Sequence, residues 1–204
     1  MRYDRVVRVV VYDRTCLTKR GALTTPWAVG AALYRAAGRI DATRGVTSWD
    51  EALAWLGALP DPITELQYWG HGKWGRAFVA EDSLDASAIA AGRLAPLRAA
   101  LAPDALVWFR TCETLGAAAG IDFAERLADH LGARVAGHTY IIGFHQSGLH
   151  GVAPGVRADW SPSEGLAEGT PEAPVRAEWS RRRAPRTITC LAGAVPADWF
   201  AGTA

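Results

Sequence analysis

The run Ala105–Cys112, Ala-Leu-Val-Trp-Phe-Arg-Thr-Cys, most strongly constrains how this chain can fold. Its central residues, Leu106 to Phe109, are all apolar. A short unbroken apolar run suits a strand buried on both faces of a parallel sheet, because a half-exposed strand would alternate apolar and polar residues. The chain that leaves such a strand brings its next side chains to the carboxyl edge of the sheet, where open α/β sheets bind ligands. We therefore expect Cys112 to lie at this edge.

A second run of the same design, Leu66–Gly72, comes earlier in the chain and ends in His71 and Gly72. Between the two runs we expect a helix that opens at Asp85 or Ser87 and runs toward Ala102, with a break at Pro96. A strand–helix–strand crossover makes the two strands parallel. Adjacent parallel strands lie about 4.8 Å apart, so the thiol and the imidazole that follow them can meet across a bound carbonyl group.

The rest of the chain alternates strand and helix patterns, which predicts an α/β fold with a mostly parallel central sheet. Further strands are expected over residues 6–12, 77–80, 134–142 and 187–191, the last returning to the core. Further helices are expected from Thr25, from Trp49 to Leu59 and from Asp122 to Gly132. Thr25 and Asp122 are expected as N-caps, and Ser48 with Glu51 has the spacing of a capping box.

Length and composition favour one domain over residues 1–204, with a core (1–150), a loop-rich segment (151–186) and a returning strand with the C-terminal tail (187–204). The chain carries 22 Lys and Arg against 21 Asp and Glu, and this balance gives no electrostatic reason to expect nucleic acid. No apolar run is long enough to span a membrane. The sequence does not define an oligomeric state.

The three cysteines, Cys16, Cys112 and Cys190, are widely spaced and form no C-x-x-C pair. This spacing argues against a disulfide framework or a cysteine zinc site, and indicates a reduced, intracellular protein. Charges interrupt the apolar run at the N-terminus, which is not the layout of a signal peptide. We therefore expect a cytoplasmic location.

Cys112 and His71 are candidates for nucleophilic catalysis, because an imidazole can accept the proton of a thiol or stabilise its thiolate. Gly72 lets a substrate approach the backbone closely. Its N–H group, together with that of Cys112, could bind the oxyanion that develops on an attacked carbonyl.

The blocks Trp69-Gly70-His71-Gly72 and Leu106–Cys112 resemble the histidine and cysteine blocks of the caspase-like (clan CD) cysteine peptidases, which include caspases, legumain, gingipain, clostripain and separase. The later stretch from Val135 to Gly155 is similar to bacterial caspase-like domains of unsettled function. The resemblance implies a three-layer α/β/α caspase-like fold and a protein or peptide substrate without a cofactor. It also implies His71 as general base or acid, Cys112 as nucleophile, and Gly72 with Cys112 as amide donors.

In that family, residues at the end of the first strand and just before the cysteine choose the substrate. Here Asp13 would favour a basic side chain before the scissile bond, whereas Arg14 and Arg110 would favour an acidic one. Because Asp13 lies nearest the strand end, we expect a basic side chain before the scissile bond. Trp74, in the loop after His71, is expected as a wall of the cleft.

Functions other than a peptidase are also compatible with parts of the sequence. A catalytically silent caspase-like module would keep Cys112 and His71 for packing and bind or regulate a protein partner. A glutamine amidotransferase would carry a Gly-x-Cys-x-Gly elbow, and the residues around Cys112 lack both glycines. His138, His145 and His150 do not have the spacing of a familiar metal site, so no metal is expected.

Overall fold

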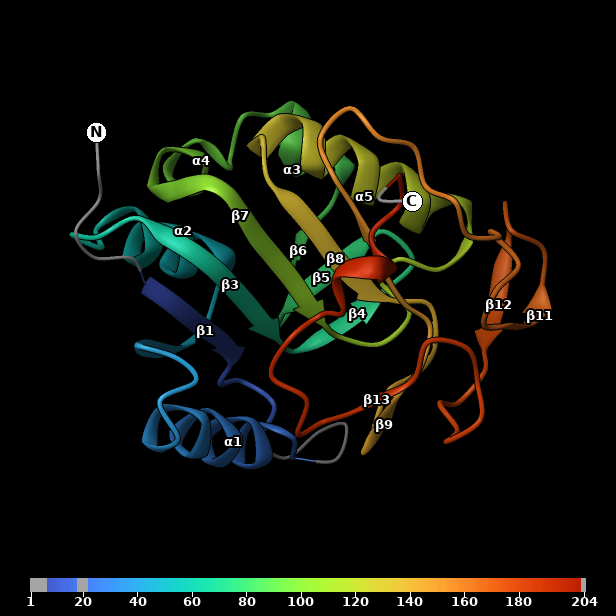
Figure 1. Cartoon of the computed structure of the whole chain (residues 1–204), viewed down its shortest axis with the longest axis horizontal. Coiled ribbons are helices and arrows are strands. Elements are labelled where there is room, and N and C mark those ends of the chain that lie inside the picture. The colour runs from blue at the N-terminus through green and yellow to red at the C-terminus, as the bar shows by residue number, and fades with distance from the viewer. Residues whose placement is uncertain (1–6, 18–21, 203–204) are drawn as a thin grey trace.

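The computed structural model describes residues 7–17 and 22–202, and its centre is a six-stranded sheet (Figure 1). The strand order is β10-β8-β7-β3-β1-β2; the five strands from β8 to β2 in this order are parallel to one another, and β10 is antiparallel to β8 at one edge. The mixed α/β fold with a mostly parallel sheet is therefore confirmed. The strands are β1 (Val7–Asp13), β2 (Ala42–Val46), β3 (Ile63–Trp69), β7 (Leu101–Arg110), β8 (Arg134–His138) and β10 (Leu149–Val152). Val6, expected in the first strand, lies outside the described residues.

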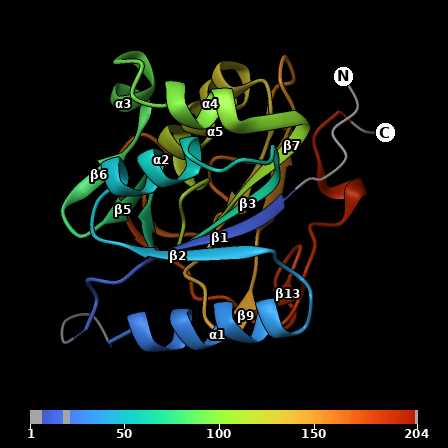
Figure 2. The ribbon, with the colours of Figure 1, turned by 90° about the vertical axis from the view of Figure 1, so that its left-hand side faces the viewer.

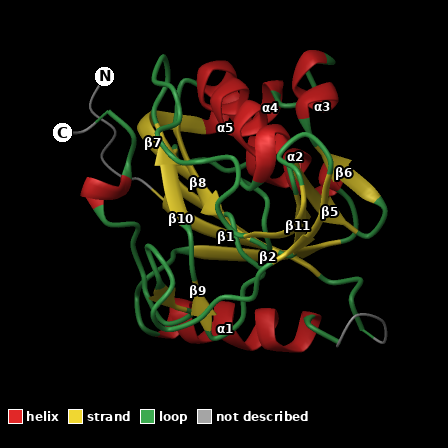
Figure 3. Ribbon diagram, turned by 90° about the vertical axis from the view of Figure 1, so that its right-hand side faces the viewer, coloured by secondary structure: helices red, strands yellow, loops and turns green. Residues whose placement is uncertain are grey.

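Helices flank this sheet on both sides. Figure 2 shows α2 (Trp49–Gly57), α3 (Ala86–Ala90), α4 (Ala95–Ala100) and α5 (Ala117–Leu131) above the sheet, and α1 (Thr24–Ala36) below it. Figure 3, from the opposite side, shows β9 (His145–Gln146) beside α1 in the lower layer. The larger core, which includes Leu56, Phe109 and Phe123, is shared with the upper helices, whereas Tyr34 of α1 packs with Val10 and Trp69.

Smaller β elements surround the main sheet. An antiparallel sheet of β4 (His71–Lys73), β5 (Arg76–Val79) and β6 (Asp82–Leu84) directly follows β3. A hairpin of β11 (Leu166–Gly169) and β12 (Pro174–Ala177) forms within the segment expected to be loop-rich. No described helix is long and apolar enough to cross a lipid bilayer.

The N-cap at Ser48 is confirmed, whereas the N-cap at Thr25 is wrong although a helix does form there. Ser48 accepts a hydrogen bond from the Glu51 N–H at 3.1 Å and caps α2. In contrast, α1 begins at Thr24, after Leu23 at the cap position, without a side-chain cap bond. The Thr24 hydroxyl instead donates to the Asp13 carbonyl at 3.1 Å and ties α1 to the end of β1. Thr24 is thus held by a tertiary contact, and Thr25 lies inside the helix.

Three other expected boundaries of helices and strands differ from those in the structure. The helix after Asp85 ends at Ala90, so the break precedes Pro96, which occupies the first turn of α4 where its missing N–H costs no bond. Helix α5 begins at Ala117, and Asp122 pairs with Arg126 on its surface instead of capping it. Strand β8 ends at His138, four residues before the expected end.

The C-terminal segment does not return to the main sheet as a strand. β13 (Ile188–Thr189) pairs antiparallel with β9 in a separate two-stranded sheet, so this expectation is wrong. The chain reaches the core further on, after the 3₁₀ turn η1 (Ala197–Trp199), where buried Phe200 bridges to Gly151 of β10.

Candidate active site

The ends of β3 and β7 bring His71 and Cys112 to the same edge of the sheet. Trp69 and Arg110 are paired neighbours in the parallel ladder, and His71 and Cys112 each follow two residues later. Figure 1 shows the two strands ending side by side next to β4. Equal offsets from one paired position explain why two residues 41 positions apart in sequence reach the same edge of the sheet.

Gly72 lies directly against the loop that carries Cys112. A Cβ atom added to Gly72 would overlap Thr114 Oγ1 and come within 2.8 Å of the Cys112 carbonyl oxygen. Glycine is therefore required by close packing of the two strand ends. Within the described part of the chain the Cys112 N–H donates to no backbone carbonyl, whereas the next N–H, of Glu113, donates to the Tyr140 carbonyl at 2.9 Å. The Cys112 N–H is thus available to a ligand oxygen.

His71 and Cys112 together line two adjoining cavities. The larger, of about 720 Å³, lies between α1 and the loops around residues 142–144 and 190–191 and is mostly apolar. The smaller, of about 370 Å³, adds polar side chains from Lys73, Glu81 and Glu113. A peptide crossing from one cavity to the other would pass over the thiol and the imidazole.

The Cys112 thiol is protonated at neutral pH in this structure. Burial and, secondly, the nearby Glu113 carboxylate raise its pKa to about 11, against a small opposing effect of the Ile142 carbonyl. The Cys112 sulfur lies 3.9 Å from that carbonyl oxygen, as a thiol donor would. Because the thiolate is the reactive form of a cysteine, the thiol of Cys112 is not activated in the free protein.

The His71 imidazole also contacts a second cysteine, Cys16, for which the sequence predicted no role in the site. Its Nε2 lies 3.4 Å from Cys16 Sγ, and its ring meets Trp27 of α1 edge-on at 5.4 Å. Cys16 follows β1, which neighbours β3 in the sheet, so it reaches the same carboxyl edge. A cysteine close behind a third parallel strand was the signal that could have identified it.

Glu113, next to the cysteine, is another site residue that sequence reasoning missed. Its side chain lines the smaller cavity, and within the described structure Oε2 is buried without a hydrogen-bond partner. Burial raises the pKa of Glu113 to about 7, although the Lys73 cation acts in the opposite direction. This carboxyl group can therefore hold or release a proton near neutral pH beside Cys112.

Three of the expected substrate-binding residues lie outside both cavities. Asp13 is buried, and its carboxylate accepts hydrogen bonds from the Thr15 N–H at 2.7 Å and the Thr15 hydroxyl at 2.6 Å. Arg14 is exposed. The backbone N–H of Trp74 donates to the Glu113 carbonyl, and the Lys73 ammonium lies 4.6 Å from the centre of the Trp74 ring. Trp74 supports the loop after His71 without forming a wall of either cavity.

Arg110 does line the larger cavity, but its guanidinium is directed into the protein. It donates to the side chains of Gln146, Tyr34 and Gln67 and to the carbonyls of Cys190 and Ala192, at 2.8 to 3.4 Å. Burial lowers the pKa of Arg110, whereas the contact with Tyr34 raises it. Arg110 thus joins β7, α1, β9 and the 190–192 segment behind the cavity.

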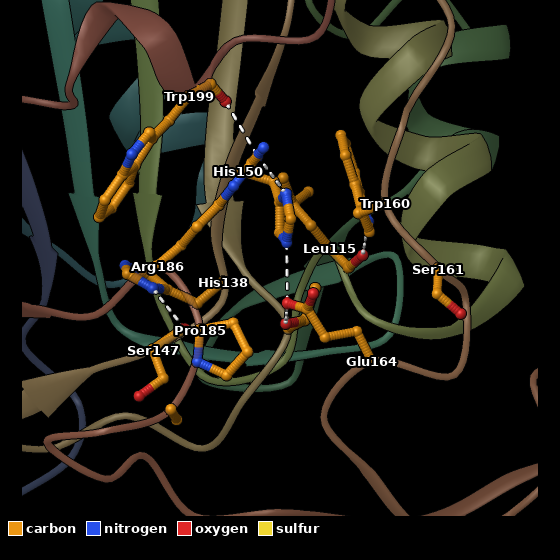
Figure 4. Close-up of polar contacts among 12 residues, drawn as sticks. Leu115, His138, Ser147, His150, Trp160, Ser161, Glu164, Pro185, Arg186 and Trp199 are labelled. Atoms are coloured by element: carbon orange, nitrogen blue, oxygen red, sulfur yellow. Dashed lines mark hydrogen bonds and ion pairs between the residues drawn. The ribbon is translucent and has the colours of Figure 1, made fainter.

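The histidines at positions 138, 145 and 150 do not converge, and no group of three His, Cys, Asp or Glu in the described residues could hold a metal ion. Figure 4 shows His150 between Glu164 and Arg186. Its Nε2 lies 2.8 Å from Glu164 Oε1, and its Nδ1 lies 2.7 Å from Arg186 Nη1. Since an arginine has no acceptor, His150 Nδ1 accepts and Nε2 donates to the carboxylate. His138 is fully buried, which lowers its pKa to about 3, and its Nδ1 lies 3.1 Å from the Ser147 carbonyl.

The fold and this site describe an α/β protein with a cysteine and a histidine at the carboxyl edge of a mostly parallel sheet. Comparisons with protein-family models, curated proteins and solved structures found no match to the chain.

Proposed function

We propose that this protein is a caspase-like cysteine endopeptidase that cleaves a protein partner through Cys112 and His71. The observation that carries the proposal is the equal offset of these residues from the paired ends of β3 and β7, in the wall of two adjoining cavities. The strand order also supports a caspase-like fold. A histidine follows one central strand, a cysteine follows the neighbouring strand, and the edge strand is antiparallel.

In the proposed reaction, Cys112 Sγ forms a bond to the carbonyl carbon of the scissile peptide. His71 takes the thiol proton and delivers it to the leaving nitrogen as the C–N bond breaks, which leaves a thioester. The N–H groups of Gly72 and Cys112 stabilise the oxyanion. Water then hydrolyses the thioester, a proton returns to sulfur, and the new carboxyl group leaves.

A second candidate is a catalytically silent caspase-like module that binds or regulates a protein. The raised pKa of Cys112 and the contact between His71 and Cys16 favour this alternative, because neither prepares a thiolate in the free protein. In both cases we propose a reducing compartment, the cytoplasm, since no disulfide joins the described cysteines.

A fluorogenic peptide library separates the candidates. Wild type is expected to hydrolyse a subset of the peptides, and Cys112→Ala and His71→Ala are expected to lower kcat/KM by at least about 10³-fold. Cys190→Ala is the matched control, because Cys190 also lines the larger cavity but has no proposed role in the reaction. Hydrolysis that survives Cys112→Ala would contradict the proposal, and no hydrolysis by folded wild type would favour the silent module.

A further inference from the structure

The larger cavity beside Cys112 is built mainly of apolar side chains. Trp27, Leu33, Ile142, Phe144 and Leu191 contribute from α1 and the two facing loops. Leu33, Phe144 and Leu191 are large and exposed, although a soluble protein gains by burying such groups. At about 720 Å³ the cavity falls within the usual range for ligand sites, about 300 to 1,000 Å³. Its wall includes Cys112, so an occupant would lie next to the nucleophile.

The charged residues that could select a basic or acidic side chain are already engaged. Asp13 is buried, is bonded to Thr15 and lies outside the cavity. Arg110 lies in the wall, but Nε, Nη1 and Nη2 all donate to neutral acceptors of the protein. A substrate carboxylate would have to break these buried hydrogen bonds before it could reach the guanidinium. Arg39 also lines the cavity; it is exposed, and its Nη1 donates to the Leu191 carbonyl at 2.5 Å. Beside this one engaged arginine, the cavity offers an entering side chain mainly apolar contact.

We propose that this cavity binds the side chain of the residue whose carbonyl Cys112 attacks, and that it selects a large apolar residue, aromatic or long aliphatic. This inference rests on the proposed peptidase function and names its substrate class. It replaces the basic preference suggested by Asp13 in the sequence. The rim residues Leu33 and Phe144 become buried when the substrate side chain enters, which supplies the driving force.

The first test compares fluorogenic peptides that differ only at the residue before the scissile bond. Peptides with Phe, Trp or Leu there are expected to show kcat/KM at least about tenfold above peptides with Arg or Asp. A preference for Arg or Asp would overturn the inference and leave the peptidase function intact.

The second test removes apolar contact from the rim. Leu33→Ser and Phe144→Ser are each expected to lower kcat/KM for the Phe peptide by about fivefold, through KM, and to change the Ala peptide little. Val29→Ser is the matched control, because Val29 lies on the same helix, is 53% exposed against 63% for Leu33, and does not line the cavity. The inference would be overturned if Val29→Ser lowered kcat/KM for the Phe peptide equally, or if neither rim variant lowered it.

The third test separates failure of the inference from failure of the function. Peptidyl acyloxymethyl ketones with Phe, Arg or Asp at the same position are incubated with wild type, and the modified residue is identified by mass spectrometry. Faster modification of Cys112 by the Phe reagent supports the inference. Equal rates with all three reagents overturn the inference alone, and no modification of Cys112 together with no peptide hydrolysis overturns the peptidase function as well.

Discussion

Glu113 shows how a single buried carboxyl group can set the pH behaviour of this site. Its side chain is mostly buried, its Oε2 has no partner among the described residues, and its charge raises the pKa of the neighbouring Cys112 thiol. Protonation of Glu113 removes that charge. The free protein therefore holds an unreactive thiol next to a carboxyl group that titrates near neutral pH.

Glu113→Gln is expected to stabilise the protein more at pH 8 than at pH 4. Burial raises the pKa of Glu113 from 4.5 to about 7, so the folded state holds this proton more tightly than the unfolded chain. The contribution of Glu113 to the free energy of unfolding therefore falls as pH rises from 4.5 to about 7, by about 3 kcal/mol. Urea unfolding at both pH values measures the difference. An equal effect of the substitution at pH 4 and pH 8 would contradict this prediction.

At the scale of the elements, the cap of α2 is a local interaction whose contribution can be isolated. Ser48→Ala removes the acceptor for the Glu51 N–H and is expected to lower the free energy of unfolding by about 1 kcal/mol. Ser48→Asp keeps an acceptor at the same position and is expected to stay within about 0.5 kcal/mol of wild type. Urea unfolding at neutral pH measures both. Equal losses in the two variants would show that the cap hydrogen bond is not the cause.

Sequence reasoning succeeded where local signals agreed with the tertiary structure. The apolar runs before His71 and Cys112 become the central strands β3 and β7, and Gly132 ends α5 in the left-handed conformation with a φ of 63°. Sequence reasoning failed where a contact with a residue distant in sequence determines the local structure. Thr24 bonds to the end of β1, and β13 pairs with β9 and not with the main sheet.

The candidate site was predictable only in part, for the same reason. The pair His71 and Cys112 follows from the ends of two strands, which local pattern identifies. The contact of Cys16 with His71 and the place of Glu113 in the smaller cavity depend on how the ends of neighbouring strands meet. The engaged state of Arg110 depends on how α1 and the 190–192 segment pack against the sheet, and no local pattern in the sequence encodes that packing.

At the scale of the whole molecule, the polar cluster around His150 fastens the C-terminal third of the chain to the sheet. Glu164 accepts from His150 and from the Thr139 hydroxyl, each at 2.8 Å, and Arg186 also donates to the Trp199 carbonyl. The His150 ring stacks on Trp160 at 4.7 Å between ring centres. The cluster therefore joins segments that lie far apart in the sequence (Figure 4).

Glu164→Gln is expected to lower the free energy of unfolding by about 2 kcal/mol at pH 7, because the hydrogen bonds that His150 and Thr139 donate to a partly buried carboxylate are weakened. Burial raises the pKa of Glu164, but the hydrogen bonds from His150 and Thr139 outweigh it, so the net pKa lies below 4.5. Its contribution is therefore present above about pH 4.5 and is lost as pH falls through the lower folded pKa.

Urea unfolding of wild type and Glu164→Gln at pH 7 and pH 3 measures this change. The matched control is Glu168→Gln, since Glu168 lies in the same segment but forms an exposed ion pair with Arg176. It is expected to change stability by less than about 0.5 kcal/mol. A Glu164→Gln effect that is larger at pH 3 than at pH 7 would contradict the sign of the shift.

The contact of Gly72 with the loop of Cys112 also has a consequence for protein engineering. Because the two strand ends touch without room for a single methyl group, neither can be shifted alone. Anyone who grafts this centre onto another parallel sheet would have to transfer residues 70–73 and 111–114 together, as one rigid block. A host scaffold whose strand ends stand even slightly further apart would receive the two chemical groups without their alignment.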